Sequence, residues 1–331
     1  MPDPRPIVDL ANAFFGSCVL FVASDLGIFR RLAEKDGLDA DTLARDLGCS
    51  SRGMRLLLDA CVAEGLLIKN GAAYGNSPVS RMFLVPGSPA DLSTAIRYNR
   101  DIYGAWGKLA EFAKTGKPVE RPEIHLGEDE QRTRTFVQSM HGKALGIGRG
   151  VIPLLDLKGS KTLLDVGGGP GTFSVLISQA FPDIHCTVLD LPEIVKVARE
   201  LIEQQGGSER VQVLAGNYHE APFPGDLDAV NFFGMLHQES AEDIQKLARK
   251  SFEALKPGGV VHVMDMMTDE THTSPQFSAL FAVTMALTTE NGWVFSANEL
   301  KGWLEGAGFV DFDVRPLPPP LPHWLAKARK P

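Results

Sequence analysis

The sequence predicts an α/β domain, with a parallel sheet covered by helices on both faces, preceded by a mainly helical domain. Three observations lead to this prediction. The chain has 331 residues, which suits two domains at about 100–200 residues each. From Lys161 onward, short apolar runs typical of buried strands alternate with helical stretches, the pattern of a parallel sheet. Before that point, apolar residues recur mostly at helical spacing.

The N-terminal part has the element order of a winged helix-turn-helix. Gly48 and Gly65 are placed to end helices, and the Asn70-Gly71 pair suits a type I′ hairpin turn. We place a winged-helix-like domain at residues 1–95 and a helical connecting layer at 96–155. The expected elements are a helix through the apolar positions from Leu10 to Leu32, a short helix with its N-cap within 38–41, a helix capped by Ser50 or Ser51, and the hairpin.

The remaining residues, 156–331, form the predicted α/β domain. Apolar runs rich in β-branched residues indicate its strands, and the stretches between them have helical periodicity. The expected strands are 162–166, 186–190, 211–215, 227–233, 259–265, 310–314 and 323–328, and the expected helices are 173–181, 194–205, 241–255 and 298–307.

Composition excludes several classes of protein. The formal charge is −8, which argues against general binding to nucleic acid or to an anionic membrane. The four cysteines show no C-x-x-C pair, and the N-terminus lacks the apolar region of a secretory signal, so we expect a reduced, cytoplasmic chain. The apolar stretches at 18–24 and 277–287 are shorter than the roughly 20 residues of a membrane span. The histidines show no metal-ligand spacing, so no metal is assigned.

A glycine-rich turn after the first strand of the α/β domain is the strongest motif. Glycines at 167, 169 and 171 lie between a strand and a helix, where such a turn lets a ligand approach the backbone. A dinucleotide site would carry its third glycine at Thr172, and no Gly-Lys-Ser/Thr segment follows. Asp165 would repel a pyrophosphate but suits a cationic ligand. Because Asp190 can grip ribose hydroxyls, the ligand that fits is S-adenosylmethionine (SAM). The alternative is a turn that merely needs glycine.

Taken together, these segments resemble the SAM-dependent O-methyltransferases related to plant caffeate and flavonoid enzymes, acetylserotonin methyltransferase and bacterial antibiotic-tailoring enzymes. The resemblance covers nearly the whole chain. It implies a class I, Rossmann-like seven-stranded sheet, a winged-helix dimerisation domain, a homodimer, SAM as cofactor and a small-molecule acceptor. Besides the winged-helix start, the segments are LDVGGGPG at 164–171, LDLP at 189–192, AGNY at 215–218, MLH at 235–237, KPGG at 256–259 and GAGF at 306–309.

The motif and the resemblance together indicate the residues of the cofactor pocket. The chain departs from the family at two of them, since Asn217 replaces a usual Asp and Phe233 stands where a Lys is frequent. An amide can still hydrogen-bond adenine, and Phe233 would have to pack against it. The expected pocket residues are Asp165, Gly167, Gly169, Gly171, Asp190, Leu191, Gly216, Asn217, Tyr218 and Phe233.

The resemblance also suggests a general base, His237. A phenol is mostly protonated at neutral pH, and a base that removes its proton helps methyl transfer. His237 follows the fourth strand, at the edge where open α/β sheets bind ligands. The family's Leu-His-Asp-Trp segment reads Leu-His-Gln-Glu here, and Asp265 matches a family Glu that flanks the base. A second flanking Glu falls near Val294 and is missing; Glu290 or Glu299 is an alternative, as is a His237 that merely bonds a loop carbonyl.

By analogy with the family, the acceptor lies between the sheet edge and nearby helices, in an apolar slot for a flat ring. Phe14 of a partner subunit is expected to contribute, and ordinary core packing is the alternative for each side chain. The expected slot residues are Phe136, Met140, Phe281, Met285 and Trp293.

The function expected is transfer of a methyl group from SAM to a hydroxyl of a small aromatic or polyketide-like molecule. C- or S-methylation is an alternative, and so is an enzyme on the same fold that binds SAM without transferring its methyl group. A winged-helix regulator that binds DNA through Arg52 and Arg55 is disfavoured, because phosphate contacts dominate DNA affinity and the chain is acidic.

Overall fold

The computed structural model describes residues 2–88, 90–121, 123 and 126–331. Its contacts divide the chain into two compact units, Met1–Asp101 and Ile102–Pro331. The helical layer expected at 96–155 contributes to both units. The boundaries at residues 95 and 155 stay a prediction.

The N-terminal unit is mainly helical, with one small sheet of order β1-β3-β2. Asp39 accepts a hydrogen bond from the Thr42 amide and so caps α4, and Ser50 likewise caps α5 through the Gly53 amide. The elements are α1 (Arg5–Asn12), α2 (Phe14–Asp25), α3 (Ile28–Glu34), β1 (Leu38–Asp39), α4 (Ala40–Asp46), α5 (Ser51–Ala63), β2 (Leu67–Asn70), β3 (Ala73–Asn76), α6 (Pro78–Phe83) and α7 (Ser93–Trp106), which crosses the division between the units.

Two expectations for this unit were wrong. The helix expected through Leu32 is broken at Gly27, which adopts a left-handed φ of 75° and begins a separate helix, α3. In the hairpin, Asn70 pairs with Ala73, so the turn residues are Gly71 and Ala72. Gly71 has a φ of 61° and Ala72 has no positive φ, which excludes the type I′ turn expected for Asn-Gly.

A further correction concerns the first two helices. Together they form the helical segment Arg5–Asp25, which is long and apolar enough to cross a membrane by length and composition alone, with a mean hydropathy of 1.8. The expectation that no stretch reaches that length was therefore wrong. Only 6% of its apolar stretch is buried in the chain, and several of its large apolar side chains are exposed, among them Ile7, Leu10 and Phe15. Such exposed apolar surfaces mark interaction sites.

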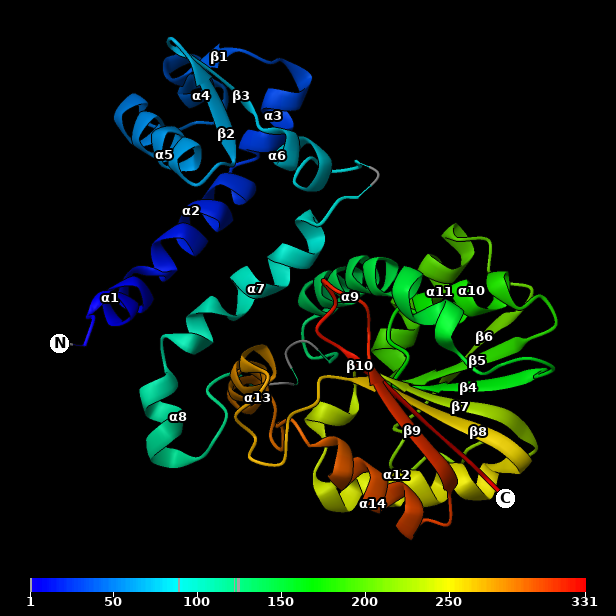
Figure 1. The fold of residues 1–331 in the computed structure, drawn as a ribbon. Helices are drawn as coiled ribbons and strands as arrows, with labels where there is room; N and C mark the ends of the chain where they lie inside the picture. Colours follow the sequence, from blue (N-terminus) through cyan, green and yellow to red (C-terminus); the bar gives the residue numbers. More distant parts are fainter. Residues whose placement is uncertain (1, 89, 122, 124–125) are drawn as a thin grey trace. The chain divides into compact units, whose positions relative to one another are not determined.

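The C-terminal unit carries a seven-stranded sheet of order β6-β5-β4-β7-β8-β10-β9, and the predicted α/β class is confirmed (Figure 1). Strand β10 runs antiparallel to β8 and β9, and the other pairs are parallel. The elements are α8 (Leu109–Thr115), α9 (Glu130–Val151), η2 (Ile152–Leu154), β4 (Thr162–Val166), α10 (Thr172–Ala180), β5 (His185–Asp190), α11 (Pro192–Gln204), β6 (Val211–Ala215), β7 (Leu227–Phe233), η3 (Leu236–Gln238), α12 (Ala241–Ala254), β8 (Leu255–Asp265), α13 (Gln276–Thr288), α14 (Ala297–Gly306), β9 (Val310–Pro316) and β10 (Trp324–Arg329).

Helices cover both faces of this sheet, as the strand–helix alternation predicts. Figure 1 shows α9, α10 and α11 on one side and α12 and α14 on the other. Successive side chains of β4 enter the two cores, since Leu163 packs in the cluster with α9–α11 and Leu164 in the cluster with α12 and α14. The strand order reverses direction between β4 and β7, and a ligand is expected at this switch point, beyond the carboxyl ends of β4, β5, β7 and β8.

Candidate functional site

The glycine turn joins the end of β4 to the start of α10. Gly167, Gly169 and Gly171 have φ values of 63°, 54° and 70°, a region in which other residues are strained. A Cβ at Gly171 would lie 2.7 Å from the Ile202 side chain, whereas a Cβ at Gly169 would meet nothing within 4 Å. The turn is therefore packed on its inner side and open at Gly169, where a ligand can approach the backbone.

Asp190 holds this turn in place from the end of β5. Its Oδ2 accepts a hydrogen bond of 2.7 Å from the Gly169 amide, and its Oδ1 accepts one of 2.7 Å from the Leu191 amide. Burial raises the pKa of Asp190 to about 6, although both hydrogen bonds act in the opposite direction. Both carboxyl oxygens are thus hydrogen-bonded to the backbone, and burial makes the ionised form of Asp190 less favourable than it would be in water.

Asp165 is fully buried behind the same turn. Its Oδ2 accepts a hydrogen bond of 2.6 Å from the Ser174 hydroxyl, while its Oδ1 is buried without a hydrogen-bond partner. Burial, and then the charge of Asp190, raises the pKa of Asp165 to about 7. A cation held near this pair would lower both pKa values, so the two acids suit a positively charged ligand and oppose a phosphate.

The loop after β6 lies beside Asp190, because the Gly216 amide donates a hydrogen bond of 2.9 Å to the Asp190 carbonyl. Asn217 uses its Oδ1 to accept from the His219 amide at 3.0 Å, which closes a local turn. Leu191 packs with Ile194 and its neighbours, a cluster that Phe136 also joins.

Phe233 is buried at the end of β7. Its ring stands edge-on to the ring of Phe173, with 5.3 Å between the centroids. The predicted contact of Phe233 with adenine stays a prediction.

His237 and Asp265 meet where β7 and β8 end. The His237 Nδ1 lies 2.6 Å from Asp265 Oδ1, and the His237 amide donates a hydrogen bond of 3.2 Å to Asp265 Oδ2. Asp265 is 1% exposed and the His237 side chain 13%. A carboxylate on Nδ1 fixes the tautomer that leaves Nε2 free to take a proton. The alternative of a His237 bonded to a loop carbonyl through this nitrogen does not fit this geometry.

Two of the expected slot residues contact His237. The Phe281 ring lies edge-on to the imidazole, with 5.0 Å between centroids, and the Trp293 amide donates a hydrogen bond of 2.9 Å to the His237 carbonyl. Met285, on the same helix as Phe281, is buried. Met140 is half-buried on α9, one turn after Phe136. A role of Met285 and Met140 in the acceptor slot stays a prediction.

The second acid expected beside His237 is absent from its position. Val294 stands there and is 2% exposed. Glu299 is committed elsewhere, because it forms a capping box with Ser296 at the start of α14 and lies 3.7 Å from His272. Glu290 is exposed. Among the described residues, Asp265 is the carboxylate that hydrogen-bonds His237.

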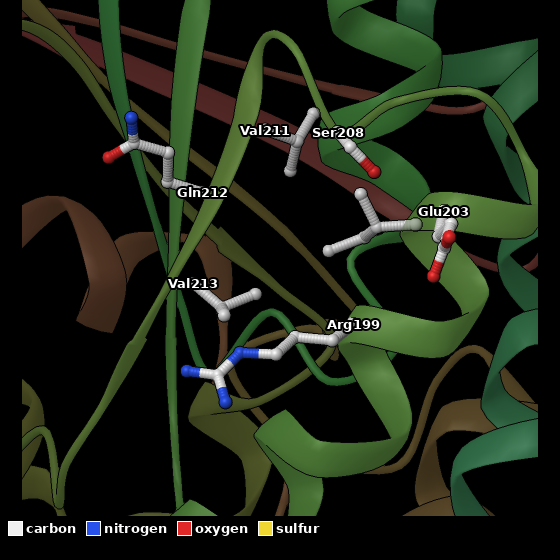
Figure 2. Close-up of a pocket in the computed structure, with 7 residues that line it drawn as sticks. Arg199, Glu203, Ser208, Val211, Gln212 and Val213 are labelled. Carbon is white, nitrogen blue, oxygen red and sulfur yellow. The ribbon is translucent and has the colours of Figure 1, made fainter.

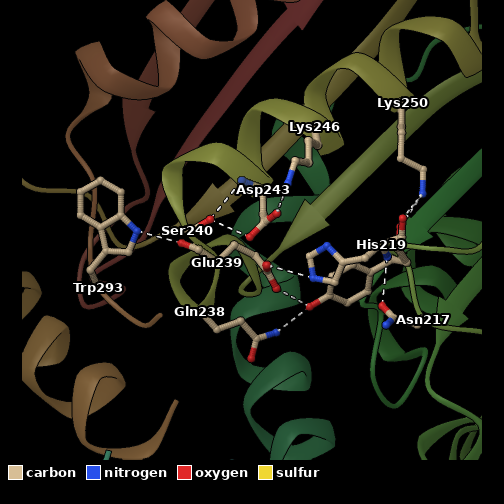
Figure 3. A network of polar contacts seen from close by, with 10 residues as sticks. Asn217, His219, Gln238, Glu239, Ser240, Asp243, Lys246, Lys250 and Trp293 are labelled. Carbon is tan, nitrogen blue, oxygen red and sulfur yellow. Dashed lines mark hydrogen bonds and ion pairs between the residues drawn. The ribbon is translucent and has the colours of Figure 1, made fainter. Parts of the chain in front are cut away.

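Sequence reasoning missed a polar network around Glu239, shown in Figure 3. Its carboxylate accepts a hydrogen bond of 2.5 Å from the Tyr218 hydroxyl and lies 3.1 Å from His219 Nε2. One feature of the sequence could have indicated it. Glu239, two residues after His237, stands where the family's Leu-His-Asp-Trp segment has Trp. Its partners come from a different loop, which spacing alone does not reveal.

A cavity also lies at the edge of the sheet. It has a volume of about 420 Å³, lies beside the edge strand β6 and is lined by Arg199, Glu203, Gln212 and neighbouring residues (Figure 2). None of the expected site residues lines it. Within the described part of the chain, no group of three or more His, Cys, Asp or Glu side chains is placed to hold a metal. His125 lies outside the described residues.

Comparison with known proteins agrees with this geometry. Residues 121–310 match an O-methyltransferase domain and residues 8–86 an O-methyltransferase dimerisation domain. The 3-hydroxy-5-methyl-1-naphthoate 3-O-methyltransferase of Streptomyces sahachiroi is 30% identical over 92% of this chain and 89% of its own length. Acetylserotonin O-methyltransferase of Macaca mulatta is 30% identical over 94% of each chain.

Among solved structures, human N-acetylserotonin methyltransferase in complex with SAM superposes with a TM-score of 0.89 at 29% identity, covering 98% of this chain and 97% of that one. The domain matches, the full-length relatives and the fold thus agree with each other. The chain therefore belongs to the O-methyltransferase family, as a SAM-dependent enzyme with a methyltransferase domain and a dimerisation domain.

Proposed function

We propose that this enzyme methylates a hydroxyl group of a small aromatic or polyketide-like acceptor, with His237 as the general base. The observation that carries the proposal is the 2.6 Å contact between His237 Nδ1 and Asp265, which directs the free Nε2 away from the carboxylate. The neighbouring Phe281 and Trp293 supply apolar ring surfaces on which a flat acceptor can pack. The relatives' own acceptors, a naphthoate and acetylserotonin, are aromatic.

Each site residue has a distinct proposed role. SAM supplies the electrophilic methyl group. Asp190 would accept hydrogen bonds from the ribose, the turn from Gly167 to Gly171 would let the nucleoside approach the backbone, and Tyr218 and Asn217 would line the adenine side of the pocket. His237 removes the hydroxyl proton, and Asp265 stabilises the imidazolium that forms. Holding the acceptor oxygen and the methyl group in line supplies much of the remaining acceleration.

The test is turnover of the purified protein with SAM and a panel of phenolic acceptors. We expect S-adenosylhomocysteine to form together with a product heavier by one methylene unit, and its fragmentation to place the new methyl on oxygen. A new methyl group on carbon or sulfur would overturn the proposed O-methylation and favour the C- or S-methylation alternative. Tight SAM binding without product for any acceptor would favour the second candidate, an enzyme that binds SAM without transferring methyl.

That second candidate has one specific observation in its favour. The base is paired with a single hydrogen-bonded acid, and the second acid position is the buried, apolar Val294. The regulator alternative is set aside, because the family is one of enzymes. A cytoplasmic location and the absence of nucleic-acid and membrane partners stay predictions.

Cofactor binding should depend on pH through Asp190. Its pKa is raised to about 6, and the ribose hydroxyls require the ionised form as acceptor. Binding is therefore complete above that pKa and is lost as the pH falls through it, with the apparent Kd rising up to about tenfold per pH unit below pH 6. Calorimetry with S-adenosylhomocysteine between pH 5 and pH 8 measures this. Asp190→Asn should remove the part of the dependence that comes from Asp190 and leave the part that comes from Asp165, whose pKa is raised to about 7. A flat wild-type profile would contradict the assignment.

We infer that two copies assemble through the N-terminal unit. The match to a dimerisation domain supports this, and so does the apolar surface of α1 and α2, where Ile7 and Leu10 are 76% and 75% exposed. Burying such side chains against a second copy removes apolar area from water. The resemblance to the family also implies that Phe14, which is half exposed, reaches the partner's acceptor slot.

Charged substitutions on this surface should separate the copies. We expect Ile7→Asp combined with Leu10→Asp to shift the mass in light scattering from twice the chain's 35.9 kDa toward the single-chain value. Val310→Asp, at an exposed apolar position of the other unit, is the control and should leave the mass unchanged. A double variant with the wild-type mass, or a wild-type chain that is monomeric and sediments with lipid vesicles, would refute the inference.

A further inference from the structure

Glu239 is a buried carboxylate that the proposed mechanism does not use. It is 6% exposed and lies between η3, which carries His237, and Ser240, the N-cap of α12. An ionised carboxylate in such a place is costly unless hydrogen bonds compensate for the lost water. The partners of Glu239 therefore indicate what its burial achieves.

Each oxygen of this carboxylate has its own partner (Figure 3). The Tyr218 hydroxyl donates to Oε1 at 2.5 Å, and His219 Nε2 lies 3.1 Å from Oε2. The Tyr218 hydroxyl in turn accepts a hydrogen bond of 3.3 Å from the Gln238 side chain. Both partners of the carboxylate belong to the loop after β6, the loop expected to line the nucleoside pocket.

The main chain of Glu239 is attached to the acceptor side. The Trp293 indole donates a hydrogen bond of 2.9 Å to the Glu239 carbonyl, while the Trp293 amide binds the His237 carbonyl at 2.9 Å. Glu239 thus connects the β6 loop, through its side chain, with the segment that carries Trp293 and His237.

The loop's backbone is fixed independently of Glu239. The Lys250 ammonium donates to the carbonyls of Tyr218 and Ala221 at 2.5 and 2.8 Å. The Gly216 amide binds the Asp190 carbonyl. What Glu239 adds is therefore specific, since its hydrogen bond restrains the ring of Tyr218. Burial, and then the charge of Glu239 and its hydrogen bond, raise the pKa of Tyr218, so the hydroxyl stays protonated and donates to the carboxylate.

We propose that Glu239 is a positioning residue for the cofactor, which fixes the Tyr218 ring as one wall of the nucleoside pocket. This inference rests on the proposed function of the same site. Without the hydrogen bond the ring regains rotamer freedom, and a bound nucleoside must order it again at a cost in affinity. The carboxylate acts through Tyr218 and does not touch the reacting atoms.

The experiment measures S-adenosylhomocysteine affinity by calorimetry in Glu239→Ala, in Tyr218→Phe, which removes only the hydroxyl, and in the double variant. We expect about tenfold weaker binding in each single variant and no further loss when Tyr218→Phe is added to Glu239→Ala, because the hydrogen bond that it would remove is already gone. Glu239→Gln keeps an acceptor oxygen and should stay within about threefold of wild type.

A control variant, together with separate measurement of KM and kcat, distinguishes a positioning role of Glu239 from a role in the stability of the fold. Glu242→Ala changes an exposed acid on α12 and should leave the affinity unchanged. In Glu239→Ala, KM for SAM should rise about tenfold while kcat at saturating SAM changes by less than about threefold. A purely structural role would lower Tm without this split.

The outcomes distinguish this inference from the proposed function. Wild-type affinity in Tyr218→Phe, or losses that multiply in the double variant, would overturn the link between Glu239 and the pocket. If Glu239→Ala does not fold, Tyr218→Phe alone decides. A wild-type protein that fails to bind S-adenosylhomocysteine would instead overturn the proposed function itself.

Discussion

Replacing His237 by alanine should lower the turnover number by about 10²–10⁴-fold, the usual contribution of a general base. The variant loses His237 Nε2, the atom proposed to take the acceptor proton, while Asp265 keeps its bond from the Met266 amide at 2.8 Å. The cofactor pocket is built from β4, β5 and the β6 loop and should be unaffected. Initial rates at saturating SAM and acceptor measure the effect.

The control for this variant is S-adenosylhomocysteine affinity, which should match that of wild type. Asp265→Asn should be intermediate, since an amide can hold the ring but stabilises the imidazolium less. A His237→Ala variant with an unchanged rate would remove this residue from the mechanism.

Replacing Asp190 by alanine should weaken S-adenosylhomocysteine binding by about 10²–10³-fold. Two losses add up, because the ribose loses its acceptor and the amides of Gly169 and Leu191 lose theirs, so the glycine turn is no longer held. Calorimetry at pH 7.5, a condition chosen above the raised pKa, gives the affinity.

Asp183→Ala is the matched control for this change, since Asp183 is an exposed carboxylate just before the same strand. It should bind as wild type does. The melting temperature of Asp190→Ala has to be measured alongside, so that weak binding of a folded protein is told apart from unfolding. An affinity equal to wild type in the folded variant would refute the ribose assignment.

The parallel sheet was predictable because its strands are short apolar runs bounded by turn residues. The expected limits of β4, β6 and β7 agree with those in the structure. Strand β8 begins at Leu255 instead of Gly259, because Leu255 pairs with Leu227 across a register shift that the Lys256–Gly259 turn signal conceals. Local spacing indicates turns well, but a pairing that bridges a bulge depends on the neighbouring strand.

Some residues of the site could likewise be predicted from local sequence, and others could not. The glycine turn and Asp190 stand out within one βα unit, and His237 was suggested by a family motif. The pairing of His237 with Asp265, 28 positions apart, follows from the adjacency of β7 and β8. The hydrogen bond between Glu239 and Tyr218 joins two loops whose contact depends on tertiary packing, and no local pattern predicts it.

The buried Val294 has a consequence for chemoselectivity. With one carboxylate on its imidazole, the enzyme offers modest electrostatic compensation to the cation that arises as the proton leaves the substrate. The ease of proton removal therefore depends more strongly on the acidity of the acceptor hydroxyl itself. Hydroxyls made acidic by a conjugated carbonyl or a fused aromatic system lose their proton more easily than those of simple phenols, so the turnover of congeners should rise with their intrinsic acidity.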